Sequence, residues 1–136
     1  ENIPFETIAY LEAIRAVYPG SLAIKHTQDK LYEKELFDQL SIPASPYRNN
    51  VSRNDAIEFA KQANYPFFIK RRKHGYDGKG IIKISSEADL LKLDDSVFCD
   101  SVCEQYVQFD REISIIAVHS IQGERAYYDI CENTHE

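Results

Sequence analysis

The sequence contains no methionine and no tryptophan, and only five glycines, five prolines and three cysteines among its 136 residues. Long apolar runs are also absent, because the hydrophobic stretches extend over a few residues whereas a membrane-spanning helix needs about 20. No charged and then apolar leader opens the chain, so we expect neither membrane insertion nor secretion. Since position 1 is Glu1 and not methionine, we expect the chain to be a piece of a longer protein.

The scarcity of cysteine excludes a disulfide-rich secreted scaffold. Cys99, Cys103 and Cys131 are odd in number, and no second pair of metal ligands accompanies the Cys99–Cys103 spacing. We expect reduced thiols that serve as small apolar side chains in a cytoplasmic protein, and neither a disulfide framework nor a zinc site.

Basic residues are outnumbered, with 16 Lys and Arg against 22 Asp and Glu and a net charge of −6. This balance disfavours nonspecific binding to nucleic acid. The segment 70–83 is an exception, because it holds six basic residues and only one acid, Asp77. Such a basic island suits a small polyanion such as a nucleotide, although a solvated strand edge decorated with Lys and Arg has the same pattern.

The composition, 43% hydrophobic and 28% charged, is typical of a folded globular chain. Two Ser-x-x-Asp capping boxes, at Ser52 and Ser86, each precede apolar residues at helical spacing. Helical periodicity between breakers predicts two earlier helices. The expected helices cover residues 4–17, about 27–40, 52–64 and a short stretch after Ser86.

β-Branched and aromatic residues predict strands between these helices. Residues 112–120 alternate strictly, and Gly123 lies in the turn that leads back into the last strand. The expected strands cover residues 67–70, 81–84, 102–107, 112–120 and 125–131. The chain is therefore predicted to be of mixed α/β class.

Three of the five glycines, Gly75, Gly78 and Gly80, lie within six residues, and Lys79 stands between the last two. Clustered glycines allow positive φ and close approach to a ligand, and their backbone N–H groups can form a phosphate-binding nest. The pattern is equally typical of a tight hairpin turn. Neither a P-loop nor a G-x-G-x-x-G fingerprint is present, but Lys70 lies on the strand that leads into the loop.

Three blocks in order, residues 68–80 with the motif G-Y-D-G-K-G, 104–114 and 132–135, carry a resemblance to a known family. Together with residues 1–4 and 28–43 they resemble the 5-(carboxyamino)imidazole ribonucleotide synthases, which are ATP-grasp enzymes of purine biosynthesis. The likeness covers essentially the whole chain. The spelling of the glycine block after a strand lysine is specific to this family within the ATP-grasp superfamily.

The resemblance implies an α+β ATP-grasp fragment with three parts. Residues 1–48 would form the end of the N-terminal domain and its connecting helices. Residues 49–106 would form the small lid domain with the glycine loop, and residues 107–136 the first hairpin of the C-terminal ATP-grasp domain.

The resemblance also implies a reaction. The family uses ATP to activate bicarbonate as carboxyphosphate, and transfers the carboxyl group to the exocyclic amine of aminoimidazole ribonucleotide. The expected ligands are thus ATP, aminoimidazole ribonucleotide, bicarbonate and Mg²⁺, with the magnesium ligands beyond residue 136. The parent protein is expected to be a homodimer without nucleic-acid or membrane partners, and the chain alone is expected to be inactive.

By position, the resemblance places Lys70 at the α-phosphate and the loop from Gly75 to Gly80 over the β- and γ-phosphates. Glu104 and the backbone of 105–107 would read the polar edge of adenine, and Glu112 would accept the ribose hydroxyls. The expected ATP-binding residues are Lys30, Lys70, Gly75, Gly78, Lys79, Gly80, Glu104, Gln105, Val107 and Glu112, and the expected substrate-binding residues are Tyr76 and Asp77.

Simpler roles exist for these residues. Lys70 and Glu112 could form a surface ion pair, Glu104 could be a solvated strand residue, and Tyr76 could pack. The sequence also departs from the family pattern: Lys30 and His119 stand where arginine is common, His74 where glycine is common and Ile81 where glutamine is common.

Two other functional classes share some of these sequence features. A kinase-like nucleotide binder would share the strand, loop and lysine, but nothing resembling H-R-D or D-F-G follows. A noncatalytic nucleotide- or nucleic-acid-binding module would use the basic island and the interleaved aromatic residues, but the net charge opposes it.

Overall fold

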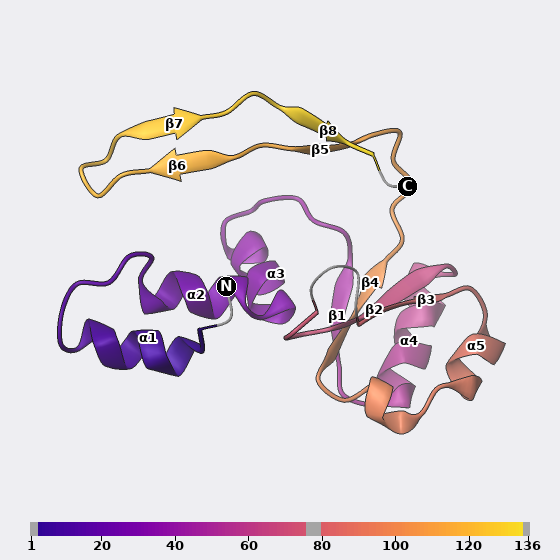
Figure 1. Cartoon of the computed structure of the whole chain (residues 1–136). Helices are drawn as coiled ribbons and strands as arrows, with labels where there is room; N and C mark the ends of the chain where they lie inside the picture. The colour runs from indigo at the N-terminus through magenta and orange to yellow at the C-terminus, as the bar shows by residue number, and fades with distance from the viewer. Residues whose placement is uncertain (1–2, 76–79, 135–136) are drawn as a thin grey trace. The chain divides into compact units, whose positions relative to one another are not determined.

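The computed structural model describes residues 3–75 and 80–134. The chain divides into two compact units, residues 1–106 and 107–136, and each is considered by itself below (Figure 1). Within the described residues, no helix has the length and apolar character needed to cross a membrane.

Unit 1 begins with three helices, α1 (Phe5–Glu12), α2 (Ser21–Thr27) and α3 (Lys30–Gln39). The predicted helix over 4–17 is therefore too long, because helix α1 ends at Glu12. Ile14 is 64% exposed, so a longer helix would bury little apolar surface there. The predicted helix over 27–40 begins three residues later than expected, because Asp29 is extended and its side chain caps α3 by accepting from the Leu31 N–H. Helix α2 was not predicted.

Four antiparallel strands form the sheet of unit 1: β1 (Tyr47–Asn50), β2 (Phe67–Arg71), β3 (Ile81–Ile84) and β4 (Ser101–Gln105). Their order is β1-β4-β2-β3, which places β4 and β2 in the centre. The predicted strands that correspond to β2, β3 and β4 are confirmed within two residues, whereas β1 was not predicted.

One face of this sheet is apolar and is covered by α4 (Arg53–Ala63) and α5 (Glu87–Lys92). Both predicted capping boxes are confirmed, since the side chain of Ser52 accepts from the Asp55 N–H and that of Ser86 from the Asp89 N–H. A 3-10 turn, Asp95–Val97, follows α5. The buried core of this face consists of Ala56, Phe59, Ala60, Phe67, Ile69, Ile84, Leu90, Phe98 and Cys103.

The buried Asn50 secures β1 to the turn before β4. Its Nδ2 donates to the Ser101 Oγ at 2.8 Å and to the Phe98 carbonyl at 3.3 Å. The Asn50 Oδ1 is buried and has no hydrogen-bond partner among the described residues. This polar pairing explains why β1 is a strand although its Tyr-Arg-Asn-Asn sequence lacks an apolar pattern.

Unit 2 is a long hairpin of four short strands, β5 (Glu112–Ser114), β6 (Ala117–His119), β7 (Arg125–Tyr127) and β8 (Cys131–Asn133). Strand β5 pairs with β8, and β6 pairs with β7. The hairpin was predicted, and Gly123 takes a φ of +91° at its turn. The prediction of one continuous strand over 112–120 is wrong, because 115–116 interrupts it. The second predicted strand, 125–131, is interrupted in the same way.

Candidate nucleotide-binding site

The second face of the sheet carries charged side chains. Because side chains alternate along a strand, Phe68 and Lys70 point away from the apolar core that Phe67 and Ile69 enter. Phe68 lies opposite Glu104 in the β2–β4 register, so these two residues share that face. We call it the charged face, and define it by Phe68, Lys70 and Glu104.

The carboxylate of Glu104 is the centre of a compact ionic cluster. Its Oε2 lies 2.8 Å from the Lys70 Nζ. Its Oε1 accepts from the Lys34 Nζ at 2.9 Å and from the Ser45 Oγ at 2.7 Å. Only 14% of the Glu104 side chain is exposed, and the values for Lys34 and Lys70 are 12% and 23%. We call these four residues the Glu104 cluster.

The environment of Glu104 fixes its charge. Burial alone would raise the pKa of this carboxyl, but the hydrogen bonds from Lys70, Ser45 and Lys34 outweigh it and lower the pKa to about 2. The carboxylate is therefore ionised at neutral pH, and the cluster of two lysines and one glutamate keeps a net positive charge. A lysine ammonium has three N–H donors, so Lys70 can contact Glu104 and a phosphate oxygen together.

Aromatic rings lie beside this cluster. The rings of Phe68 and Tyr106 are 5.8 Å apart between centroids, and the Lys83 Nζ lies 4.9 Å from the Tyr106 centroid. The Lys70 Nζ is 5.6 Å from the Phe68 ring. Such a surface of flat rings and cations can contact a nucleobase and its phosphates at the same time.

Of the predicted glycine loop, Tyr76, Asp77, Gly78 and Lys79 lie outside the described residues. Gly80 takes a φ of +80°, and a Cβ there would lie 3.3 Å from the Arg71 side chain. His74 has a φ of 59°, a left-handed conformation that favours glycine. This backbone is compatible with the expectation that glycine is common at the position of His74 in related sequences.

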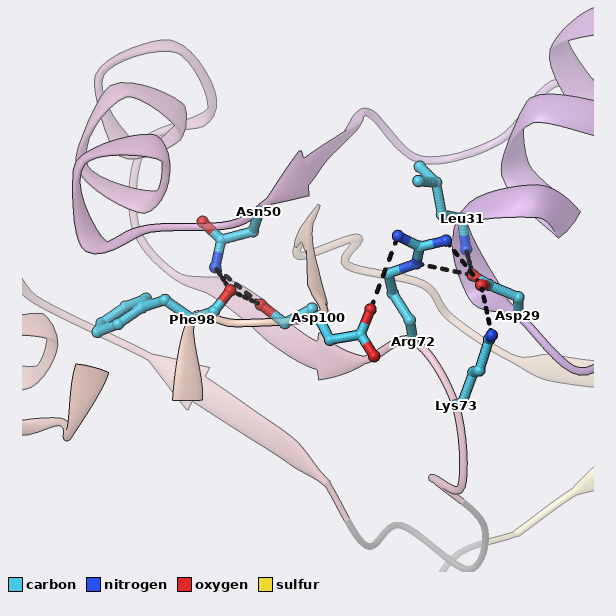
Figure 2. Close-up of polar contacts among 8 residues, drawn as sticks. Asp29, Leu31, Asn50, Arg72, Lys73, Phe98 and Asp100 are labelled. Atoms are coloured by element: carbon cyan, nitrogen blue, oxygen red, sulfur yellow. Dashed lines mark hydrogen bonds and ion pairs between the residues drawn. The ribbon is translucent and has the colours of Figure 1, made fainter. Parts of the chain in front are cut away.

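A second ionic cluster fixes the base of the loop (Figure 2). Figure 2 shows the Arg72 guanidinium pointing at Asp29, to which its Nε and Nη2 donate at 2.9 and 2.7 Å. The Lys73 Nζ lies 3.9 Å from the Asp29 Oδ2, and the Asp100 Oδ1 lies 3.7 Å from the Arg72 Nη1. Asp29 is only 1% exposed, and although burial raises the pKa of its carboxyl, the bonds from Arg72 and the Leu31 N–H lower it overall.

Backbone hydrogen bonds reinforce this attachment. The Lys30 N–H donates to the Arg72 carbonyl, and the Arg72 N–H to the Asp100 carbonyl, both at 3.0 Å. Lys30, a predicted ATP-binding residue, therefore begins α3 beside the base of the loop. Its contact with a nucleotide stays a prediction.

The remaining predicted residues are less directly defined. The Gln105 N–H donates to the Pro46 carbonyl at 2.9 Å, so reading of adenine by backbone N–H groups would fall to the residues after it. Val107 and Glu112 belong to unit 2, where the Glu112 Oε1 accepts from the Asn133 Nδ2 at 2.9 Å. The assignment of Glu112 to the ribose stays a prediction.

All three cysteines are free thiols, as predicted. Cys103 is buried in the apolar core, and burial raises its pKa to about 12. Cys99 and Cys131 are exposed, so the expectation that they too fill apolar space is wrong. Among the described residues no group of three or more His, Cys, Asp or Glu side chains could hold a metal ion.

The residues that organise both clusters were not predicted as site residues: Lys34, Ser45, Asp29 and Arg72. Arg72 was noted only as part of the basic island. Lys34 and Ser45 lie 70 and 59 positions from Glu104, so no local pattern could pair them with it. An ion pair between Lys70 and Glu112 was considered as a simpler role than nucleotide binding. The structure instead pairs Lys70 with Glu104.

A sequence profile described as the ATP-grasp domain matches residues 35–136, and the chain therefore belongs to the ATP-grasp domain family. It is similar to the N5-carboxyaminoimidazole ribonucleotide synthase of Pseudomonas aeruginosa, with 34% identity over 140 residues that cover 100% of this chain and 38% of that protein.

Two solved structures are also similar. The N5-carboxyaminoimidazole ribonucleotide synthetase from Thermus thermophilus matches with a TM-score of 0.87 and 31% identity, over 100% of this chain and 36% of that one. The N5-carboxyaminoimidazole synthetase from Staphylococcus aureus complexed with ADP matches with a TM-score of 0.87 and 27% identity, over 99% and 36%. The chain thus spans between 36% and 38% of the length of these relatives.

Proposed function

We propose that this chain is part of an N5-carboxyaminoimidazole ribonucleotide synthase, an ATP-dependent ligase of purine biosynthesis. A bicarbonate oxygen attacks the γ-phosphorus of ATP, the bond to the β-phosphate oxygen breaks, and carboxyphosphate and ADP form. The exocyclic amine of aminoimidazole ribonucleotide then attacks the carboxyl carbon, and phosphate and a proton leave. The names of the relatives and their match to the whole chain support this assignment.

In this proposal the chain supplies nucleotide-binding residues. Lys70 binds the α-phosphate, and the glycine loop, with Gly75, Gly78, Lys79 and Gly80, covers the β- and γ-phosphates. Lys30 supports the phosphates from α3, and Glu104 holds Lys70 from beneath. The ADP bound in the similar Staphylococcus aureus structure supports a nucleotide as the ligand.

The other predicted contacts are retained as part of the proposal. Glu104 and the backbone of 105–107 read the polar edge of adenine, Glu112 accepts the ribose hydroxyls, and Tyr76 and Asp77 face the ribonucleotide. We also keep the three-part division at residues 48 and 106, although the first boundary falls within β1 (Tyr47–Asn50). The compact unit that ends at Tyr106 supports the second boundary.

The observation that carries the proposal is the position of the Lys70 Nζ. It lies 2.8 Å from Glu104 on the charged face, on the strand that leads directly into the glycine loop. Ion pairing with a shielded carboxylate fixes a flexible lysine at one place before any ligand arrives. A phosphate that bridges this lysine and the loop would be bound by a prepared site.

The proposal also includes Mg²⁺, aminoimidazole ribonucleotide and bicarbonate as ligands, a cytoplasmic location and a homodimeric parent protein. The described residues offer no cluster suited to Mg²⁺, so no step is assigned to the metal here. The nucleic-acid alternative is weakened because Arg72, a member of the basic island, is already paired with the buried carboxylate of Asp29.

The proposal is tested with the complete protein that carries this chain. ADP release is measured with ATP, Mg²⁺, bicarbonate and aminoimidazole ribonucleotide present, and again with each omitted. We expect product only when the ribonucleotide and bicarbonate are both supplied. ADP release that is unchanged when bicarbonate is omitted, or steeply salt-dependent DNA binding without nucleotide turnover, would contradict the proposal.

A further inference from the structure

The structure assigns to Lys34 and Ser45 the role of positioning residues for the nucleotide site, which act on Lys70 through Glu104. This inference rests on the proposed nucleotide-binding function. It adds residues from α3 and from the segment before β1 to a site that the sequence placed on the sheet and its loop. Neither residue was among those predicted to bind ATP.

Geometry supports this role, because the two oxygens of Glu104 have different partners. Oε2 contacts Lys70, while Oε1 accepts from Lys34 and Ser45. Lys34 also donates to the Ser45 Oγ at 3.2 Å, so Lys34, Ser45 and the Glu104 Oε1 are all bonded to one another. A carboxylate held at one oxygen by two donors cannot rotate freely, and the other oxygen therefore presents a fixed partner to Lys70.

The positive charge of Lys34 also supports this role. A single lysine and a single carboxylate would neutralise each other, leaving little attraction for a polyphosphate. Lys34 supplies the second positive charge, so the cluster as a whole remains cationic. The side chains of Lys34 and Glu104 are 12% and 14% exposed, and such shielded charges are less screened by salt than surface charges.

The ion pair of Lys34 and Glu104 differs from an ordinary surface ion pair. Lys61 and Glu58 on α4 also form a 2.7 Å ion pair, but their side chains are 65% and 53% exposed and are three residues apart. A pair of that kind contributes little to stability. Lys34 instead pairs with Glu104, 70 positions away, in a shielded environment. The Lys61–Glu58 pair is therefore a matched control for the loss of a lysine from an ion pair.

The experiment measures the dissociation constant of ADP by calorimetry in the complete protein. We expect Lys34→Met to weaken ADP binding about tenfold, because it removes one charge and one of the two donors that hold the Glu104 Oε1. Ser45→Ala should weaken it about threefold, since one neutral donor is lost. Lys34→Arg should stay within about twofold of the unchanged protein, and Lys61→Met should show no change.

A double-mutant cycle separates positioning from general stabilisation. If Lys34 acts through Glu104, Lys34→Met should weaken ADP binding clearly less in a Glu104→Gln background than in the unchanged protein, because only the direct charge of Lys34 is then lost. Equal weakening in both backgrounds would overturn the inference, as would unchanged affinity in Lys34→Met with only a lower melting temperature. If Lys34→Met does not fold, Ser45→Ala with unchanged ADP affinity overturns it.

The failure of this inference differs from the failure of the proposed function. Tight ADP binding by the unchanged protein together with no effect of Lys34 or Ser45 removes only the positioning role. A complete protein that does not bind ADP at all removes both.

Discussion

The two faces of the four-stranded sheet in unit 1 are built from the same strands but serve different ends. Phe67, Ile69 and Ile84 point into an apolar core under α4 and α5, where they are at most 2% exposed. Phe68, Lys70 and Glu104 alternate with them and form the charged face. A single step along β2 therefore changes the role of a side chain from stabilising the fold to preparing a site.

The difference also concerns how each face is held. The apolar face depends on burial, which has no preferred direction. The charged face depends on bonds of fixed geometry, from Lys34 and Ser45 to Glu104 and from Glu104 to Lys70. Substitutions on the first face should affect stability alone, and those on the second should also affect ligand binding.

The largest expected effect is that of Phe67→Ala. Phe67 is fully buried, and its ring packs edge-on against Phe59 with centroids 5.4 Å apart. We expect a loss of about 4 kcal/mol in the free energy of unfolding, from lost burial and the cavity left behind. Urea denaturation measures it, and ADP affinity of the folded fraction should not change.

The neighbouring Phe68→Ala is the matched control for Phe67→Ala, because Phe68 lies on the charged face and contacts Tyr106. It should cost about 1 kcal/mol of stability. Equal destabilisation by the two substitutions would remove the distinction between the faces.

The next effect is the acid sensitivity given by Glu104. Its pKa is about 2 in the folded protein against an ordinary value of 4.5, so the ionised form is favoured by folding. The resulting stability is fully present above pH 4.5 and is lost as the pH falls toward 2. The difference amounts to about 3 kcal/mol.

Urea denaturation of the unchanged protein and of Glu104→Gln, at several pH values between 7 and 2.5, measures this contribution. The difference between the two proteins should narrow as the pH falls. A constant difference across that range would show that the charge of Glu104 contributes nothing.

A smaller effect is expected for Asp29→Asn at the base of the loop. Asparagine still caps α3 through its side-chain oxygen, so the substitution removes mainly the ion pair with Arg72. We expect a loss of about 2 kcal/mol, because Arg72 stays partly buried without its counter-charge. Thermal unfolding measures it, and Asp55→Asn, an exposed helix-cap substitution, is the control with a loss below about 1 kcal/mol.

The smallest effect concerns Cys103, on the apolar face. Burial raises its pKa to about 12, so its thiol should react with a disulfide reagent only after unfolding, whereas Cys99 and Cys131 should react at once. Cys103→Ala should lower stability by about 1 kcal/mol and leave nucleotide turnover of the complete protein unchanged. Rapid labelling of all three thiols in folded protein would contradict the burial.

Much of the apolar face could be predicted from the sequence, because its signals are local. Ser52 and Ser86 marked the starts of α4 and α5, and the β-branched and aromatic content of 67–70 and 81–84 marked β2 and β3. Strand β1 was missed because Asn50 holds it by bonds to residues about 50 positions away.

The charged face was predicted only in part. Lys70 and Glu104 were recognised through their place in family motifs, but their contact with each other was not. Asp29 and Arg72 were not recognised as a pair because 43 positions separate them. Contacts of this kind depend on the folded sheet, and neither spacing nor composition contains them.

In this proposal the charged face binds a nucleoside polyphosphate through Lys70. Calorimetric titration of ADP into the complete protein and into its Lys70→Met variant tests it most directly, with circular dichroism to verify that both are folded. We predict that the unchanged protein binds ADP and that Lys70→Met binds it at least about tenfold more weakly, since a charge-assisted bond to phosphate is lost. Equal ADP affinity in the two folded proteins would contradict the account.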